Sequence, residues 1–386
     1  MKQIKSTHIF KIIIPVAIML AMVCLFNTKA SAKTYTISPG SGAYKNFGSS
    51  GNLSRHYYLI RSYLKKLEHG GGTLVLKKGT YKVSNALFVA SNTTIKFENG
   101  VKIIKTNGNS TSLFQLLADS KYGRKNVTRK YKGEHNIKFI GSGKVIFDLK
   151  KLNRNNGNEI GIVMGNNKNV TIKGITFKNI KKGHMIEMDG CKNVKILNCK
   201  FMNMTDKQFN NKEAINIDAN DKKTGSFSQD WSKRDKTPNC NILVKGCTFK
   251  NLVRAVGTHR YSKGKFHTRI QFINNKVEKV KTPVGMINWK NSTVKGNTFT
   301  NCKANSRYNY TFLFAGVRNV TFTNNTMKKC KAYDLVKYYE YYQTSYGTYP
   351  PTKSKLTKAN LKALKNNKST GGTKKRVIIA DKEFNW

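Results

Sequence analysis

One short phrase recurs six times between Asn169 and Cys330, and this repeat constrains the fold more than any other feature of the sequence. Each copy alternates apolar and polar residues, reaches a Gly or Asn, and continues into a second short run with apolar residues at fixed spacing. The copies start at Asn169, Asn193, Asn241, Thr268, Ser292 and Asn319. Copies about two dozen residues apart are typical of a solenoid.

The alternation within each copy has the period of a β-strand, and Gly or Asn suits a tight corner where φ is positive. The corner residues are Gly174, Asn198, Gly246, Asn274, Gly296 and Asn324. Strands joined by such corners predict an all-β fold, a parallel β-helix in which each coil buries its inward side chains against the next coil. We place this β-helix at residues 71–335.

The first 32 residues are expected to be a signal peptide. Lysines precede an apolar run from Ile12 to Phe26, and Ala30-Ser31-Ala32 has the small residues of a signal peptidase site. The mature chain should therefore start near Lys33 and be secreted, either extracellular or associated with the cell wall. No later apolar run is long enough to form a transmembrane segment.

Both ends of the β-helix are expected to carry caps. Residues 33–70 include a helical pattern from Leu53 to Glu68 that ends at a run of glycines. Residues 336–386 hold a tyrosine-rich segment, a predicted short helix from Leu356 to Leu364 and a predicted closing strand from Arg376 to Ala380. The tyrosines either pack along the solenoid or offer faces on which sugars stack.

The chain is strongly basic, with 71 Lys and Arg against 19 Asp and Glu and a formal net charge of +52. Lysines recur on the outward positions of nearly every coil. Two interpretations stay open: a solvated surface kept soluble by charge, or a surface for a negatively charged partner. For a secreted monomer, that partner would be an acidic polysaccharide or an anionic cell-wall polymer. Specific nucleic-acid recognition is not expected, because aromatic and basic residues are not interleaved as in reading motifs.

Six cysteines follow the signal segment. Cys302 and Cys330 share an inward position on neighbouring coils and could form either an apolar ladder or a disulfide. Cys199 and Cys247 also share a position, but we expect one coil between them. Their separation would then be about 9.6 Å, too far for a disulfide.

The stretch from Gly71 to Thr106 contains the phrases GGT, GTY and N-x-T-I around apolar strands. It resembles the opening coils of the pectate-lyase-like superfamily of right-handed parallel β-helices, which includes pectate lyases and polygalacturonase-like hydrolases. The resemblance implies a right-handed β-helix and suggests activity on polysaccharides. It is more specific for the fold than for the reaction, because many activities share this scaffold.

Three strand segments align just before the repeated phrases: His184–Asp189, Glu213–Asp218 and Arg254–His259. Their middle apolar residues fall into register, so the polar residues are expected to face solvent. The resulting ladders are His184, Glu213 and Arg254; Glu187, Asn216 and Gly257; Asp189, Asp218 and His259. Two inserts, 221–239 and 260–267, should wall a groove over these ladders.

This groove is the candidate active site. Asp189 and Asp218 would lie about 5 Å apart on neighbouring coils, and their repulsion should raise one pKa, as suits a general acid. The candidate catalytic residues are Asp189, Asp218, Glu213 and His259. The candidate substrate-binding residues are His184, Glu187, Asn216, Arg254, Arg260, Trp231, Trp289 and Lys290. The competing structural interpretation is that the aspartates cap turns, that His184 and Arg254 pair with Glu213 in an ion ladder, and that the tryptophans pack.

The resemblance to polygalacturonase-like hydrolases is partial at this site. The order Asp189, Asp218, His259, Lys290 follows the family sequence, but the side-by-side aspartates are absent and Asn288 stands where an arginine is expected. Hydrolysis of an acidic, uronate-type polysaccharide is the favoured hypothesis, because two carboxylates suffice and no cofactor or metal is required.

Two alternatives to hydrolysis stay open. The first is β-elimination in the same groove with Arg254, Arg260 or His259 as base, where Ca²⁺ could be held by Asp189, Asp218 and Glu187. The second is a non-catalytic β-helix that binds polyanions or the cell wall through its lysines.

Overall fold

A computed structural model describes residues 33–44, 51–106, 110–149, 159–205, 212–303, 311–330, 338–341, 354–371 and 381–384. The chain divides into residues 1–33 and 34–386, and every helix and strand described below belongs to the second unit. The predicted signal peptide and most of the tyrosine-rich segment lie outside the described residues. Within the described ranges, no helix combines the length and apolarity needed to cross a membrane.

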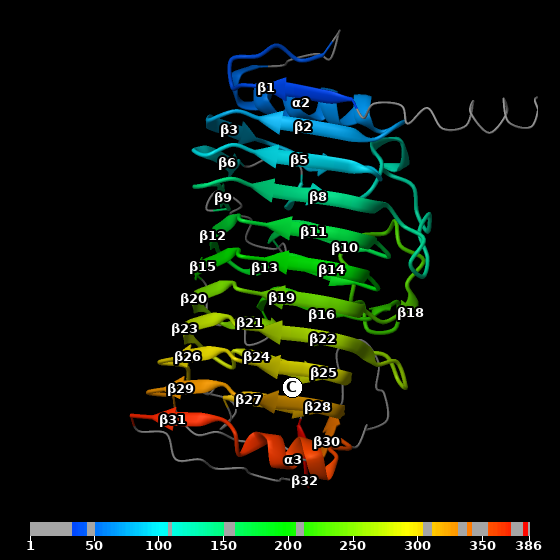
Figure 1. The fold of residues 1–386 in the computed structure, drawn as a ribbon. Coiled ribbons are helices and arrows are strands. Elements are labelled where there is room, and N and C mark those ends of the chain that lie inside the picture. Colours follow the sequence, from blue (N-terminus) through cyan, green and yellow to red (C-terminus); the bar gives the residue numbers. More distant parts are fainter. Residues whose placement is uncertain are drawn as a thin grey trace, which may run out of the picture. The chain divides into compact units, whose positions relative to one another are not determined.

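Three parallel sheets run the length of the second unit, with the strands of successive coils stacked on one another (Figure 1). The first sheet contains, in spatial order, β1 (Thr34–Ile37), β2 (Gly72–Leu76), β5 (Thr93–Phe97), β8 (His135–Gly141), β11 (Lys168–Lys173), β14 (Lys192–Leu197), β19 (Cys240–Lys245), β22 (His267–Ile273), β25 (Trp289–Lys295) and β28 (Arg318–Thr323). The second sheet contains β4 (Leu87–Phe88), β7 (Ser112–Gln115), β10 (Glu159–Gly165), β13 (Gly183–Asp189), β16 (Glu213–Asp218), β21 (Arg254–Gly257), β24 (Val284–Ile287) and β27 (Phe312–Ala315). The third sheet contains β3 (Gly79–Val83), β6 (Val101–Lys105), β9 (Ile146–Asp148), β12 (Thr176–Ile180), β15 (Lys200–Met204), β20 (Thr248–Leu252), β23 (Lys276–Val280), β26 (Thr298–Thr300), β29 (Thr326–Lys328) and β31 (Lys368–Thr370).

The predicted all-β, right-handed parallel β-helix is confirmed by this arrangement. The corners lie where the repeats placed them, with positive φ angles such as 70° at Gly174 and 52° at Asn198. The apolar residue three positions after each corner points inward and stacks on its counterpart in the next coil. Phe147, Phe177, Phe201 and Phe249 form such a stack, with ring centroids 5.2, 5.2 and 4.9 Å apart. The repeat thus sets both the register and the core.

A second inward column consists of amides. Asn275, Asn297, Asn325 and Asn367 lie on successive coils, and all four are buried. The Oδ1 atoms of Asn297, Asn325 and Asn367 each accept two hydrogen bonds from the asparagine on the preceding coil. One comes from its backbone N–H and one from its Nδ2, at 2.8 to 3.0 Å. Each Nδ2 also donates to a backbone carbonyl. This interior ladder satisfies the polar groups that the turn leaves inside the core.

Helices accompany the β-helix near both ends of its sequence, as the sequence predicted. Helix α2 (Gly51–Leu67) packs Leu59, Leu64 and Leu67 into the core. Helix α3 (Lys358–Leu364) starts at a capping box formed by Thr357 and Asn360. The strand after α3 is β31, which pairs with β29, whereas the predicted closing strand 376–380 lies outside the described residues. A short backbone pairing joins β30 (Tyr338–Tyr341) to β32 (Asp381–Phe384).

The expected spacing of Cys199 and Cys247 is wrong. Strand β14 pairs directly with β19, so no coil lies between the two residues, and the backbone N–H of Cys199 is 3.4 Å from the Cys247 Sγ. The long segment between them holds β16 and an insert, which belong to the same coil. These cysteines, and also Cys302 and Cys330, are free thiols buried in the core.

Candidate functional site

The second sheet brings the three polar segments together in the register that the sequence predicted. Glu187 pairs with Asn216, and Asp189 pairs with Asp218. On the next step, Glu213 pairs with Arg254. The apolar residues between them, including Ile186 and Ile215, belong to the main core.

The expectation that these polar side chains face solvent is wrong. Glu213, Asp189, Asp218 and Arg254 are 0% exposed, and His184, Glu187, Asn216 and His259 are no more than 6% exposed. Part of the cover is the insert, residues 221–239. Strand β17 (Asn220–Asp221) leads into this insert, which also contains strand β18 (Asp235–Thr237). The ladders therefore form a buried polar cluster rather than an open groove.

Apolar residues fix the insert on the second sheet. Phe227 and Trp231 pack edge to face, with centroids 4.8 Å apart. They form an outer apolar cluster together with Ala86, Phe88, Leu117, Ile160 and Val163. The Trp231 Nε1 donates to Gln115 Oε1 at 3.1 Å. Trp231 is thus part of the packing that closes the site, which corrects its expected role as an exposed sugar-binding residue.

Trp289 and Lys290 do not join the cluster either. Trp289 lies in the main core at 0% exposure, and its Nε1 donates to Thr258 Oγ1 at 2.9 Å. This burial corrects its predicted role in binding substrate. Lys290 belongs to β25 of the first sheet, where it pairs with Thr268 and Arg318. The chain turns a corner between the second and first sheets, which separates Lys290 from the carboxylates.

Glu213 is the centre of one half of the cluster. Its Oε1 accepts a 2.9 Å hydrogen bond from Arg254 Nη1, and its Oε2 lies 3.0 Å from His259 Nδ1 and 3.8 Å from His184 Nδ1. The His184 Nδ1 donates to the backbone carbonyl of Glu213 at 2.8 Å. Burial alone would raise the pKa of Glu213, but His259, Arg254 and His184 outweigh burial and hold this pKa far below its usual range. Burial lowers the pKa of His184 to about 3.

Three carboxyl groups make up the other half. Asp218 Oδ1 accepts the backbone N–H groups of His259 at 2.9 Å and Arg260 at 3.1 Å. Glu187 accepts the backbone N–H and the hydroxyl of Ser228 in the insert. Neither oxygen of Asp189 has a hydrogen bond within the described part of the chain. Burial raises the pKa of Asp189 well above its usual range, and the nearby Glu187 and Asp218 raise it further.

The remaining predicted residues hold this cluster together. Asn216 Nδ2 lies 3.0 Å from His259 Nδ1. Arg260 reaches back to the insert, where its Nη1 donates to the carbonyls of Thr224 and Gly225. The insert is therefore tied to the β-helix by Arg260 at one end and by Glu187 near its middle.

Two sets of these residues could hold a cation. Ligand atoms of His184, Glu213 and His259 lie within 4.8 Å of one another. However, Arg254 already neutralises Glu213, and the His184 Nδ1 is bonded to a carbonyl, so this set is satisfied as an ion-pair network. The second set is Asp189, Asp218 and Glu187, the residues expected to hold Ca²⁺ in the elimination hypothesis. Asp189 offers two oxygens without hydrogen bonds, whereas Glu187 and Asp218 already accept backbone N–H groups.

The protonation of Glu187 makes a prediction about stability. Burial raises its pKa to about 7, from 4.5. Because the folded state holds this proton more tightly than the unfolded state, its stabilising contribution is complete below about pH 4.5 and is lost as the pH rises through about 7. Glu187→Gln cannot ionise, so relative to the wild type it should gain about 3 kcal/mol of unfolding free energy between pH 4.5 and 8.

Urea unfolding of both proteins at pH 4.5 and pH 8 measures this difference. Glu98→Gln, at a partly exposed acid, controls for the change in net charge. If the Glu187→Gln variant differs from the wild type by the same amount at both pH values, Glu187 does not titrate in this range and the prediction is wrong.

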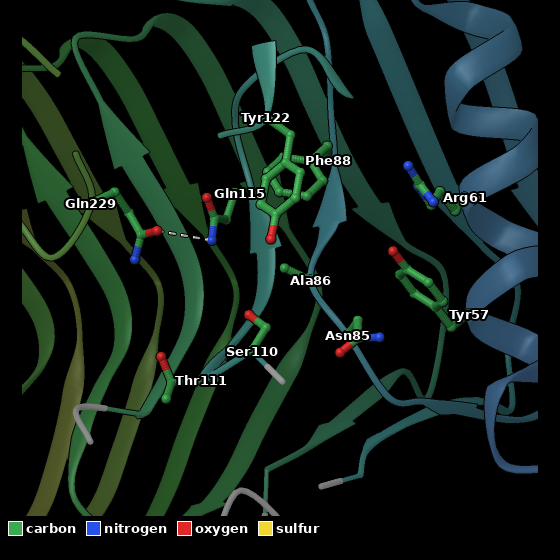
Figure 2. Close-up of a pocket in the computed structure, with 10 residues that line it drawn as sticks. All are labelled: Tyr57, Arg61, Asn85, Ala86, Phe88, Ser110, Thr111, Gln115, Tyr122 and Gln229. Atoms are coloured by element: carbon green, nitrogen blue, oxygen red, sulfur yellow. Dashed lines mark hydrogen bonds between the residues drawn. The ribbon is translucent and has the colours of Figure 1, made fainter. Parts of the chain in front are cut away.

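An open pocket lies beside the cluster, where the sequence predicted none. It has a volume of about 360 Å³ and is lined by Tyr57, Arg61, Asn85, Ala86, Phe88, Ser110, Thr111, Gln115, Tyr122 and Gln229 (Figure 2). Tyr122 is 69% exposed and its ring lies 4.9 Å from that of Phe88. Gln115 donates to Gln229, which is bonded to the hydroxyl of Ser228. The pocket therefore borders the part of the insert whose Ser228 donates hydrogen bonds to Glu187.

Comparisons with known proteins support the fold. No known protein-family profile matches this sequence. The "Plasmin and fibronectin-binding protein A" of Streptococcus pneumoniae is 26% identical over 258 residues, which cover 60% of this chain. That match spans 34% of the relative, so this chain corresponds to about a third of its length.

Among solved structures, the crystal structure of PfbA, a surface adhesin of Streptococcus pneumoniae, is similar with a TM-score of 0.60 and 18% identity. The likeness covers 87% of this chain and 79% of that one, and it confirms the β-helix fold. A family 28 exopolygalacturonase of Yersinia enterocolitica has a TM-score of 0.40 and 15% identity, over 79% of this chain and 67% of that one. The second likeness is too weak to bear on activity.

Proposed function

We propose that this protein is a non-catalytic β-helix that binds anionic polysaccharides at the outside of its coils. The observation that carries the proposal is the separation of charge between the inside and the outside of the fold. Eight acidic residues are buried: Glu134, Asp148, Glu159, Glu187, Asp189, Glu213, Asp218 and Asp221. Among the lysines and arginines of the described ranges, only Lys105, Lys212 and Arg254 are buried. The exposed surface of the described residues therefore carries a larger excess of positive charge than the composition of those residues alone would give.

Such a surface attracts polyanions over long distances and keeps them bound through many weak contacts. The buried cluster agrees with a binding role, because a polysaccharide cannot reach carboxylates that are 0% exposed. The relative from Streptococcus pneumoniae carries a name that describes binding to other molecules rather than catalysis. An extracellular or wall-associated location would place this surface next to acidic polysaccharides.

Cleavage of the same polymers is the second candidate function. Glu187 favours cleavage, since a carboxyl with a pKa of about 7 suits a general acid. Glu187 is also near the open pocket, because it accepts a hydrogen bond from Ser228, and the next residue, Gln229, lines that pocket. Hydrolysis would require a second carboxylate on the other side of the scissile bond and an insert that moves aside to admit the substrate. The binding function needs no such movement.

One experiment tests both candidates. The purified protein is titrated with hyaluronan and, as an uncharged control, with dextran, at salt concentrations of about 50 and about 200 mM. We expect binding to hyaluronan that weakens roughly tenfold or more over this range, because bound polyanions release counterions. Dextran should not bind.

Size-exclusion chromatography of the polymer after prolonged incubation gives the second readout. The binding function predicts unchanged chain length, whereas shortened hyaluronan would establish cleavage. Absence of hyaluronan binding at either salt concentration would refute the proposed function.

A further inference from the structure

The outer face of the first sheet carries a column in which lysines and uncharged residues alternate from coil to coil. The column crosses nine consecutive strands, from β2 to β28. Its members, in spatial order, are Val75, Lys96, Ile140, Lys173, Leu197, Lys245, Ile273, Lys295 and Thr323. We call this set the alternating column. The stacked coils extend the column beyond the aligned repeats, to Val75, Lys96 and Ile140.

The side chains of this column are accessible. All four lysines are exposed, and Val75, Ile140, Leu197, Ile273 and Thr323 are partly exposed. Neighbouring strands of a sheet are about 4.8 Å apart, so successive lysines of the column are about 9.6 Å apart. Two coil steps are close to the length of one disaccharide in an extended polysaccharide chain.

A second column lies two residues earlier on the same strands and has the opposite phase. Lys138 pairs with Thr94 and Thr171, and Lys195 pairs with Thr171 and Leu243. Lys138 lies on β8 and Lys195 on β14, where the alternating column has Ile140 and Leu197. The two columns together place one exposed lysine on each strand from β5 to β19, alternating between two lines.

Repulsion between stacked lysines explains why they avoid adjacent coils, since like charges directly opposite destabilise a sheet. It does not explain why apolar residues fill the positions between them. The third sheet shows the other solution, because Lys250 pairs there with Glu278 at 3.0 Å and Lys102 with Asp148 at 3.7 Å. None of the six lysines of the two columns forms an ion pair within the described residues. The first sheet thus keeps its positive charge and adds apolar contacts to it.

We infer that this face binds an extended polysaccharide that carries one anionic group per disaccharide, with the polymer running across the stacked strands. This inference rests on the proposed function and assigns it to one sheet. The anionic groups meet the lysines of the alternating column, and the C–H faces of the sugar rings rest on the apolar side chains between them. Lys138 and Lys195 give the same polymer a second line of positive charge.

The two columns fit a nucleic acid less well. Duplex DNA carries one charge for about every 1.7 Å along its axis, far denser than these lysines. Single strands are bound through aromatic side chains on which bases stack, and neither column contains an aromatic residue. Sugar rings with widely spaced charges fit both the spacing and the apolar residues.

Two variants with equal changes in net charge test the inference. The first replaces Lys96, Lys173, Lys245 and Lys295 with Gln. The matched control replaces Lys82, Lys200, Lys276 and Lys328 with Gln, which are exposed lysines of the third sheet spread over a similar length. Because all eight side chains are exposed, both variants should keep the thermal unfolding midpoint of the wild type, which is measured first.

Binding is then measured with hyaluronan, which carries one carboxylate per disaccharide, and with κ-carrageenan, which carries one sulfate. We expect the first variant to lose roughly tenfold or more in affinity for both polymers and the control to lose much less. A loss with only one polymer identifies carboxylate or sulfate as the recognised group.

Equal losses in the two variants, or no loss in the first, would overturn the inference while leaving the proposed function intact. Tighter binding of duplex DNA than of either polysaccharide at equal salt, abolished in the first variant, would also overturn it. If the wild type binds neither polysaccharide, the proposed function itself fails.

Discussion

Replacing Glu213 with Ala is expected to destabilise the protein by about 3–5 kcal/mol, because breaking a buried ion pair leaves the other charge without compensation. Arg254 is 0% exposed, and its Nη1 donates to Glu213 Oε1 at 2.9 Å. His259 loses its 3.0 Å contact to Oε2 in the same variant. The free energy of unfolding, measured with urea at pH 7, should show the loss.

Two further variants separate charge from shape. Glu213→Gln keeps the volume but removes the charge, so it should fall between the wild type and Glu213→Ala. The double variant Glu213→Leu with Arg254→Met removes both charges, and it should recover much of the stability because apolar pairs replace buried ion pairs at little cost. If the double variant is as unstable as Glu213→Ala, the loss comes from packing and not from the isolated charge.

Glu213 also shows which part of the site could be predicted from the sequence. The repeats fixed the register, so the pairing of Glu213 with Arg254 and of Asp189 with Asp218 followed from aligning the coils. Strand alternation then placed these side chains outside the core. Whether outside means solvent depends on what covers the sheet, and a repeat pattern contains no information about a cover.

The cover is an insert without periodicity. Phe227 and Trp231 are large apolar residues of this insert, and Ile160 and Val163 are apolar residues on the outer side of β10. The need to cover Ile160 and Val163 could have suggested that Phe227 and Trp231 pack on them. In the sequence alone, a tryptophan in an insert near carboxylates fits sugar binding equally well. The open pocket was missed for a similar reason, because it combines helix α2, two early coils and Gln229 of the insert.

The alternating column was half visible in the sequence. The residue before each corner in the aligned copies reads Lys173, Leu197, Lys245, Ile273, Lys295 and Thr323. The alternation becomes meaningful once β5 and β8 are shown to continue it with Lys96 and Ile140, and that pairing crosses a long irregular segment. A surface of this kind depends on stacking order, which short copies define and long loops conceal.

The interior amide ladder makes the last prediction, in which Asn325→Ala should cost about 3–5 kcal/mol. The Oδ1 of Asn325 accepts the Asn297 N–H at 2.9 Å and the Asn297 Nδ2 at 2.9 Å, and its own Nδ2 donates to the Val294 carbonyl at 3.0 Å. The substitution leaves several buried polar groups without partners, and each costs about 1–3 kcal/mol.

A second ladder of asparagine side chains, formed by Asn169, Asn193 and Asn241 on the outside of the first sheet, supplies the matched control. Asn193 lies near the start of β14, is partly exposed and has a φ of 56°. Its Nδ2 donates to Asn169 Oδ1 at 3.0 Å, and its Oδ1 accepts from Asn241 Nδ2 at 2.8 Å. Asn193→Gly keeps this φ accessible and exposes the freed groups to water, so it should cost less than about 1 kcal/mol. Both variants are compared by urea unfolding at pH 7. Equal costs would mean that the interior asparagines act only through the turn conformation, whereas a large difference assigns their contribution to burial of hydrogen bonds in the core.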